Sequence, residues 1–133
     1  MLPAIVRIAA LLAMLSSVAC ESLTQSEKEV VRDLRHFQLD IETEYSRGTA
    51  TALNFLPGIG NFYLDQTGLG VMNLLFWPIS IVWGMPQAWV DTPVMNEKYT
   101  ADYYRTRAGQ LKMQEHLQVL QIPPEEWPYW IRR

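Results

Sequence analysis

The chain has only one cysteine and two histidines among its 133 residues, and charged residues make up only 19% of it. One cysteine cannot form an internal disulfide, and Cys20, His36 and His116 are too scattered to form a recognisable metal-binding set. We therefore expect no metal, and we expect both histidines to be solvated on helices. A basic run is also missing, and the formal net charge is -3. These features exclude the electrostatic footprint of a nucleic-acid-binding protein.

Motifs that would carry catalysis are missing as well. The chain has no Gly-x-Ser-x-Gly elbow, and Gly58 and Gly60 lack the lysine and the helix context of a phosphate-binding loop. Carboxylates are plentiful only in charged, helix-like stretches, where a solvated face explains them. Asp65 is the exception, because it lies between two apolar runs, but aspartate is a common turn residue. We therefore predict a non-enzymatic protein with no catalytic residues and no cofactor.

The first 19 residues have the pattern of a cleaved export signal. Arg7 precedes an apolar run from Ile8 to Leu15, and small residues follow it. This run is far shorter than the roughly twenty apolar residues that span a bilayer. A charged start, a short apolar stretch and small residues before the cut are typical of secretory signals.

The residues Ser17-Val18-Ala19-Cys20 resemble the lipobox of bacterial lipoproteins, which is cut before a cysteine that receives diacylglycerol and palmitate. The resemblance implies that the mature chain begins at a lipidated Cys20, followed by a linker over 20–25. The alternative is an ordinary signal peptide cut after Ala19. A free exported thiol would be open to oxidation, so lipidation gives the lone cysteine a reason. Each buried methylene contributes about 0.8 kcal/mol, and more than one acyl chain gives stable anchoring.

The segment 26–48 is predicted to be an amphipathic helix. Ser26 and Glu29 match a capping box, and Gly48 is the expected C-terminal stop. Apolar residues recur at helical spacing and form a narrow stripe. The stripe suits packing within the protein or binding to a partner helix, and its width favours internal packing. Its members are Val30, Leu34, Phe37, Ile41 and Tyr45.

The segment 49–90 is predicted to be an apolar helical hairpin. Residues 49–64 and 69–90 carry no charge, and Asp65 begins the polar turn between them. The second run would be about 33 Å long as a helix, against a hydrocarbon core of about 30 Å. Insertion in the bilayer, full or partial, competes with a buried hairpin core in a small globular lipoprotein. Length and lack of charge favour insertion. Polar residues are scattered through both runs: Asn54, Asn61, Asn73, Ser80 and Gln87.

In the stretch 56–75, Gly60-Asn61-Phe62-Tyr63-Leu64-Asp65 is followed by a second segment that begins Gly68-Leu69-Gly70. This stretch resembles the two-transmembrane-helix (TM-two) domain family, whose first segment carries Gly-x-His-Arg-Phe-Tyr-Leu-Gly and whose second segment is led by glycine. Here His-Arg is absent and Asp65 stands in place of the last glycine. The resemblance covers about twenty residues and implies a paired-helix membrane module, without an activity. Glycines in such a place permit a tight turn and close helix approach, and Tyr63 suits a membrane interface. The hairpin motif consists of Gly58, Gly60, Phe62, Tyr63, Leu64, Gly68, Gly70 and Asn73.

The segment 91–121 is predicted to be a second amphipathic helix. Thr92 is a suitable cap and Pro93 suits the first helical position. One apolar stripe contains Met95, Tyr99 and Tyr103, and another contains Met113, Leu117 and Leu120. The residues Arg105 to Gly109 lie between the stripes and are expected to kink the helix. The aromatic tail over 122–133 has two equal interpretations, an interfacial anchor or a cover for a gap on the helices.

We therefore predict an all-α protein in which two amphipathic helices flank an apolar hairpin, after a cleaved signal peptide. The expected function is that of a lipid-anchored bacterial envelope protein with a structural or interaction role. The alternative is an accessory or binding subunit of a membrane complex. The expected partners are membrane lipid and either a second copy or another membrane protein. The expected location is the outer or inner membrane, facing the periplasm.

Overall fold

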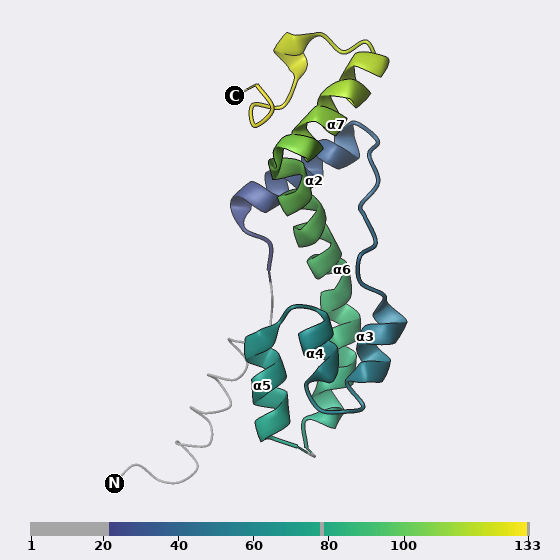
Figure 1. The fold of residues 1–133 in the computed structure, drawn as a ribbon, viewed down its shortest axis with the longest axis vertical. Coiled ribbons are helices and arrows are strands. Elements are labelled where there is room, and N and C mark those ends of the chain that lie inside the picture. The colour runs from purple at the N-terminus through teal and green to yellow at the C-terminus, as the bar shows by residue number, and fades with distance from the viewer. Residues whose placement is uncertain (1–21, 78, 133) are drawn as a thin grey trace, which may run out of the picture. The chain divides into compact units, whose positions relative to one another are not determined.

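The computed structural model describes residues 22–77 and 79–132, and this part of the chain is all-α with no strand, as predicted (Figure 1). Cys20 and the expected signal peptide lie outside the described residues. The elements are α2 (Gln25–His36), α3 (Arg47–Leu53), α4 (Ile59–Tyr63), α5 (Thr67–Leu75), α6 (Ile81–Arg105), α7 (Arg107–Val119) and a short 3-10 helix, η1 (Pro124–Glu126).

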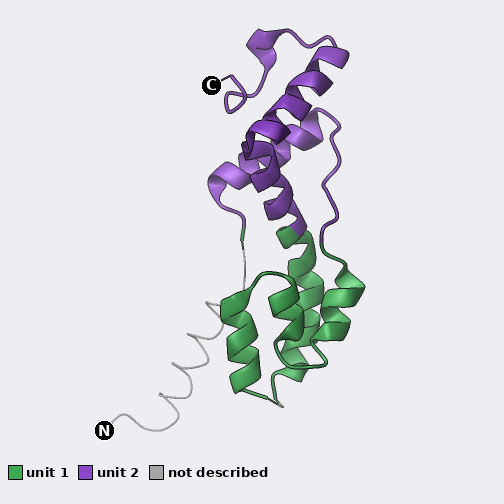
Figure 2. Ribbon diagram, viewed as in Figure 1, with its two compact units in different colours: residues 1–22, 45–95 green, residues 23–44, 96–133 purple. Residues whose placement is uncertain are grey.

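These elements form two compact units (Figure 2). We call residues 45–95 the apolar unit; it contains α3, α4, α5 and the first part of α6. We call residues 23–44 together with 96–132 the charged unit; it contains α2, the rest of α6, α7 and η1. Only three residues of the apolar unit are charged: Arg47, Asp65 and Asp91.

Helix α2 begins one residue earlier and ends twelve residues earlier than the helix predicted over 26–48. Thr24 is its N-cap and forms the capping box with Glu27, so the predicted box of Ser26 and Glu29 is wrong. The sequence fits both pairs, because Thr24 and Ser26 are each followed three residues later by a glutamate. At the other end Gln38 adopts a φ of 60°, and Leu39 N–H donates to the carbonyl of Leu34 over 2.8 Å. This Schellman arrangement terminates the helix without the usual glycine.

The expected stop at Gly48 is therefore wrong, because Gly48 lies inside α3. The chain between α2 and α3 is not helical, and its backbone is held by the charged unit. Glu42 N–H donates to the Thr100 hydroxyl of α6 over 3.0 Å. Phe37 and Ile41 of the predicted stripe still pack against the core of that unit.

The turn at Asp65 is confirmed, but each arm of the predicted hairpin is divided again. Pro57 and Gly58 separate α3 from α4, and Gly58 has a left-handed φ of 80°. Residues 76–80 separate α5 from α6, so the uncharged run 69–90 is not one helix. Between residues 22 and 132, position 78 aside, no helix is both long enough and apolar enough to cross a membrane.

The predicted helix start at Thr92 and Pro93 is wrong, because α6 runs from Ile81 to Arg105 with Pro86 and Pro93 inside it. A proline in a helix removes one backbone donor and crowds the preceding turn. Packing keeps the helix continuous here: Ala88 and Thr92 are fully buried, and the Thr92 hydroxyl donates to the Ala88 carbonyl over 2.6 Å. The kink predicted at Arg105 to Gly109 is a complete break in the structure, since α6 ends at Arg105 and Thr106 caps α7.

A single hydrophobic core holds the charged unit together. Its buried members come from α2, α6, α7 and the tail, and include Leu34, Tyr104, Met113 and Leu117. The α6 stripe is displaced from the predicted one, because Ala101 and Tyr104 face this core while Tyr99 is exposed.

The tail covers the helices of the charged unit, which is the second of its two predicted interpretations. Trp130 is only 9% exposed, and its ring N–H donates to Asp33 of α2 over 3.0 Å. Ile131 is buried in the same core, and Tyr129 donates its hydroxyl to Glu29 over 2.7 Å. The rings of the tail therefore stabilise α2 directly.

Candidate functional site

A chain of hydrogen-bonded polar side chains runs through the apolar unit, and all of its members are buried except Trp83, which is 41% exposed. The Trp83 ring N–H donates to Asn73 Oδ1 over 2.8 Å, and the Asn73 amide donates to Asn61 Oδ1 over 2.7 Å. The Asn61 amide donates to Gln66 Oε1 over 2.9 Å, and the Gln66 amide donates to Asp91 Oδ2 over 3.1 Å. Every link points the same way, so the chain ends on a carboxylate. We call these five residues the polar chain.

The polar chain joins three helices. Asn61 lies on α4, Asn73 on α5, and Trp83 and Asp91 on α6. The Ser80 hydroxyl adds another link by donating to the backbone carbonyl of Asn73 over 2.7 Å. A buried polar group without a partner costs about 1 to 3 kcal/mol, so these bonds favour one arrangement of the helices over others.

Asn54, the C-cap of α3, connects that helix to the same interior. It is 1% exposed, and its amide donates to the carbonyl of Gly84 on α6 over 2.7 Å. Its Oδ1 has no hydrogen-bond partner among the described residues, but it would lie 2.9 Å from a Cβ placed on Gly60. The Ala50 carbonyl oxygen lies still closer to that Cβ position, at 2.1 Å, so α3 and α4 approach each other closely at Gly60.

Three of the four glycines in the predicted motif are needed for close packing. A Cβ on Gly58 would collide with the Gly70 carbonyl, and one on Gly60 would collide with the Ala50 carbonyl. A Cβ on Gly70 would lie 2.8 Å from the ring of Phe62, whereas one on Gly68 would meet nothing within 4 Å. Close backbone approach at glycine is the packing device of helices in membranes.

The remaining motif residues lie on both sides of α4. Phe62 is 39% exposed, and Leu64 is fully buried beside Ala50 and Met95. Tyr63 is half-buried; its hydroxyl accepts from Ser46 N–H over 3.1 Å. Asn73 belongs to the polar chain. The structure thus brings together the predicted motif residues except Gly68, which faces open space.

The polarity of the apolar unit is inverted. Its buried polar or charged residues outnumber its buried hydrophobic ones, whereas the charged unit has the opposite balance. The surface is inverted too, because fourteen of the nineteen exposed large hydrophobic side chains among the described residues belong to the apolar unit. The exposed set includes Phe55 (66%), Leu75 (71%), Trp77 (61%), Ile79 (66%) and Val82 (78%).

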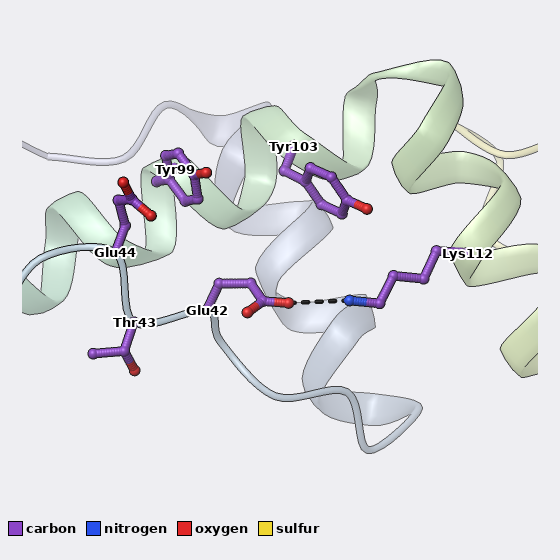
Figure 3. Close-up of a pocket in the computed structure, with 6 residues that line it drawn as sticks. All are labelled: Glu42, Thr43, Glu44, Tyr99, Tyr103 and Lys112. Atoms are coloured by element: carbon purple, nitrogen blue, oxygen red, sulfur yellow. Dashed lines mark hydrogen bonds and ion pairs between the residues drawn. The ribbon is translucent and has the colours of Figure 1, made fainter.

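The charged unit has a shallow hollow of about 180 Å³ (Figure 3). Lys112 Nζ lies 3.1 Å from Glu42 Oε1 and 5.6 Å from the centre of the Tyr103 ring. The hydrogen bond that Lys112 donates to Glu42 and the nearby tyrosines raise the pKa of Lys112. The ammonium is thus held by groups of the same chain, and no nucleophile with a base partner lines the hollow. Its lining residues are Glu42, Thr43, Glu44, Tyr99, Tyr103 and Lys112.

Two further groups of the charged unit have shifted pKa values. Burial raises the pKa of Tyr104. Burial also acts to raise the pKa of Glu27, but hydrogen bonds from the Thr24 backbone and hydroxyl and the charge of Arg105 outweigh it, so this pKa lies below its ordinary value. Both groups have structural surroundings, a hydrophobic core for Tyr104 and a helix cap for Glu27.

The described histidines have different surroundings. His36 is exposed, as predicted, whereas His116 is half-buried with Nε2 2.9 Å from the Phe37 carbonyl oxygen. Within residues 22–77 and 79–132 no three His, Cys, Asp or Glu side chains form a group suited to a metal ion.

Comparison with known proteins finds no matching family model, no matching curated protein and no matching solved structure. The most unusual described feature of the chain is the apolar unit, with the polar chain inside and hydrophobic side chains outside.

Proposed function

We propose that this protein is a lipid-anchored component of the bacterial envelope with a structural or interaction role, and that its apolar unit is embedded in lipid. The single observation that carries the proposal is the inverted polarity of that unit. A unit that folds in water buries apolar side chains and exposes charges. This unit buries amides and exposes Leu75, Trp77 and Ile79.

Lipid contact accounts for the exposed surface on energetic grounds. Fully burying one large hydrophobic side chain contributes about 1.5 to 3 kcal/mol. Fourteen partly exposed side chains therefore represent on the order of 10 kcal/mol of unfavourable exposure to water. Large contiguous apolar patches are rare on monomeric soluble proteins and mark sites of contact with a protein or a membrane. Acyl chains would relieve the exposure without displacing the polar interior.

The lipobox-like sequence at Cys20 supports the same proposal from another part of the chain. An acylated N-terminus and an apolar helical region would give two attachments to one membrane, with the amphipathic helices of the charged unit in water. The proposed location is the envelope, in the outer or inner membrane and facing the periplasm.

The first experiment is intact-mass spectrometry of the mature protein after membrane fractionation. We expect a chain that begins at Cys20 and carries the added mass of a diacylglycerol and a fatty acid. The Cys20→Ala variant should accumulate as an uncleaved precursor without this mass. Fatty-acid labelling that is unchanged in Cys20→Ala would contradict lipidation.

A second experiment tests the apolar unit without the acyl chains. The Cys20→Ser chain, exported with an ordinary cleavable signal peptide, should remain in the membrane pellet after carbonate extraction. The matched control replaces four exposed side chains of the apolar unit by glutamine: Leu74, Leu75, Ile79 and Val82. That control should move to the soluble fraction. Release of the unaltered Cys20→Ser chain as a monodisperse soluble protein would contradict lipid embedding.

A second candidate function is that of an accessory subunit of a membrane complex. Exposed apolar residues on and next to α7 favour it, since Leu111 is 56% exposed and Val119 75%. The aromatic tail is less suited to the contact because its rings are engaged with α2. Co-purification with one membrane protein, lost in Val119→Asp but kept in Lys28→Ala, would support this role.

A further inference from the structure

The two ends of the apolar unit differ in chemistry. Its helices alternate in direction, so residues 54–58 after α3 and residues 76–77 and 79–80 after α5 lie toward one end, and the α4–α5 turn lies at the other with the start of α3 (Figure 1). We call the first end the tip. The tip carries no charged residue. Its exposed hydrophobic side chains are Phe55, Leu56, Leu75, Phe76, Trp77 and Ile79.

The opposite end carries the charges of the unit. Asp65 is exposed in the α4–α5 turn, and Asp91 is bonded to Gln66 beside that turn. Arg47 starts α3, and its guanidinium carbon lies 5.8 Å from the centre of the exposed Trp89 ring. Arginine with tryptophan is a combination typical of the level of lipid headgroups.

The distance between these ends matches half a bilayer. Ten residue steps separate Ile81, at the start of α6, from Asp91, which corresponds to about 15 Å along a helix. The nine residues of α5 correspond to about 14 Å. The hydrocarbon core of a bilayer is about 30 Å thick, so one leaflet contributes about 15 Å.

The backbone of the tip is suited to hydrocarbon. In a bilayer interior every backbone donor needs a partner within the protein. The N–H groups of Phe55 and Leu56 donate to carbonyls three residues earlier, and those of Trp77, Ile79 and Ser80 donate three or four residues back. The polar chain likewise keeps its side-chain donors inside the unit.

We infer that the apolar unit enters a single leaflet tip first, reaches about the bilayer midplane and does not cross to the other side. The inference rests on the proposed lipid embedding and adds its depth and direction. Acyl chains surround Trp77 and Ile79, while Arg47, Asp65 and Trp89 lie at the headgroups of the same leaflet.

The test is the depth of nitroxide spin labels on single cysteines in the full-length acylated chain, reconstituted in phosphatidylcholine vesicles. Ile79→Cys and Val90→Cys are a matched pair, because both side chains are 66% exposed on the apolar unit. Val119→Cys, at 75% exposure on the charged unit, is the control for water. Because the mature Cys20 is acylated, each introduced thiol is the only one available for labelling.

We expect the Ile79 label to be near the midplane, with high collision rates with oxygen and low rates with a water-soluble nickel complex. The Val90 label should lie about one leaflet thickness shallower, at about 15 Å, and the Val119 label should behave as in water. A membrane-impermeant maleimide should fail to modify Ile79→Cys from either side of the vesicle.

The two proposals fail in different ways. If the Ile79 label collides with the nickel complex as often as the Val119 label does, lipid embedding itself is wrong. If Ile79→Cys is modified only from the side opposite to Val119→Cys, the unit crosses the bilayer and the one-leaflet inference is wrong. Equal shallow depths at Ile79 and Val90 would also overturn it, because the unit would then lie flat.

Discussion

Gln66 Oε1 accepts a hydrogen bond from Asn61 Nδ2 over 2.9 Å at the C-terminal end of α4. At the equivalent position, α2 and α7 each have a hydrophobic residue that contacts a core. All three helices end in a Schellman arrangement with a non-glycine residue at positive φ: Gln38, Asp65 and Gln121. In α2 and α7 the next residue, Leu39 or Ile122, packs on the core of the charged unit. In α4 the next residue is Gln66, which is buried against an amide. The residue after the positive-φ position is thus hydrophobic in the charged unit and polar in the apolar unit, although the backbone motif is the same.

The first prediction concerns these helix ends. Gln38→Gly should stabilise the charged unit by about 1 kcal/mol, because glycine avoids the cost of a side chain in the left-handed region. Urea unfolding followed by circular dichroism measures the change. Lys28→Gly, inside α2, is the control and should destabilise by about 1 kcal/mol. If Gln38→Gly lowers the stability, the positive φ of Gln38 does not destabilise the folded chain in the way proposed.

The second prediction concerns the polar chain. Asn73→Leu should destabilise the apolar unit by about 3 kcal/mol although it adds apolar volume, because Trp83 N–H and Asn61 Oδ1 lose their partners. Thermal unfolding in mild detergent measures this loss. Val71→Leu, on the exposed face of the same helix, should leave the midpoint nearly unchanged. A neutral Asn73→Leu would show that the hydrogen bonds do not hold these helices together.

The third prediction separates two glycines of the motif. Gly60→Ala should cost about 3 kcal/mol, because its Cβ meets the Ala50 backbone and the Asn54 side chain. Gly68→Ala should be neutral or stabilising by up to about 1 kcal/mol, because its Cβ meets open space within a helix. The same detergent unfolding assay compares them. Equal effects of the two substitutions would be inconsistent with the packing of α3 against α4.

The fourth prediction concerns the acid sensitivity of the α2 cap. The pKa of Glu27 is lower in the folded chain than its ordinary value of 4.5, so the ionised carboxylate stabilises the fold above that value. This contribution should disappear as the pH falls below 4.5 through the folded-state pKa. Glu27→Gln removes the negative charge from the first turn of α2, so it should lower the stability at pH 7 by up to about 1 kcal/mol and flatten this part of the acid dependence.

Melting temperatures between neutral and acidic pH provide the measurement for the cap. The exposed Glu115→Gln on α7 is the matched control and should retain the dependence of the unaltered chain. If the stability of Glu27→Gln falls with acid as steeply as that of the unaltered chain, then other carboxylates cause the acid sensitivity.

Several parts of the fold were predictable because they depend on short stretches of sequence. The turn at Asp65 follows from a polar residue between two uncharged runs, and the break before Gly109 follows from residues close to it. The end of α2 was missed because Gln38 carries no local signal for a left-handed conformation. The start of α6 was missed because Thr92 and Pro93 have the chemistry of a helix start, and the packing of Ala88 and Thr92 overrides it.

The candidate site was only partly predictable. The amides of the apolar segment were visible as scattered polar residues, and their pairing was not. Asn61 and Asn73 are twelve positions apart, and Gln66 and Asp91 are twenty-five apart. Spacing along the chain cannot bring such residues together, because the turns that do so depend on contacts between helices.

The sequence by itself determined the helical class, the uncharged middle segment and the charged segments on each side of it, because composition and charge are local properties of the chain. Only the tertiary structure decided that Asn61 and Asn73 face inward while Trp77 and Ile79 face outward. Burial depends on how helices distant in sequence pack. In the apolar unit, hydrogen-bonded polar side chains outnumber hydrophobic ones among the buried residues.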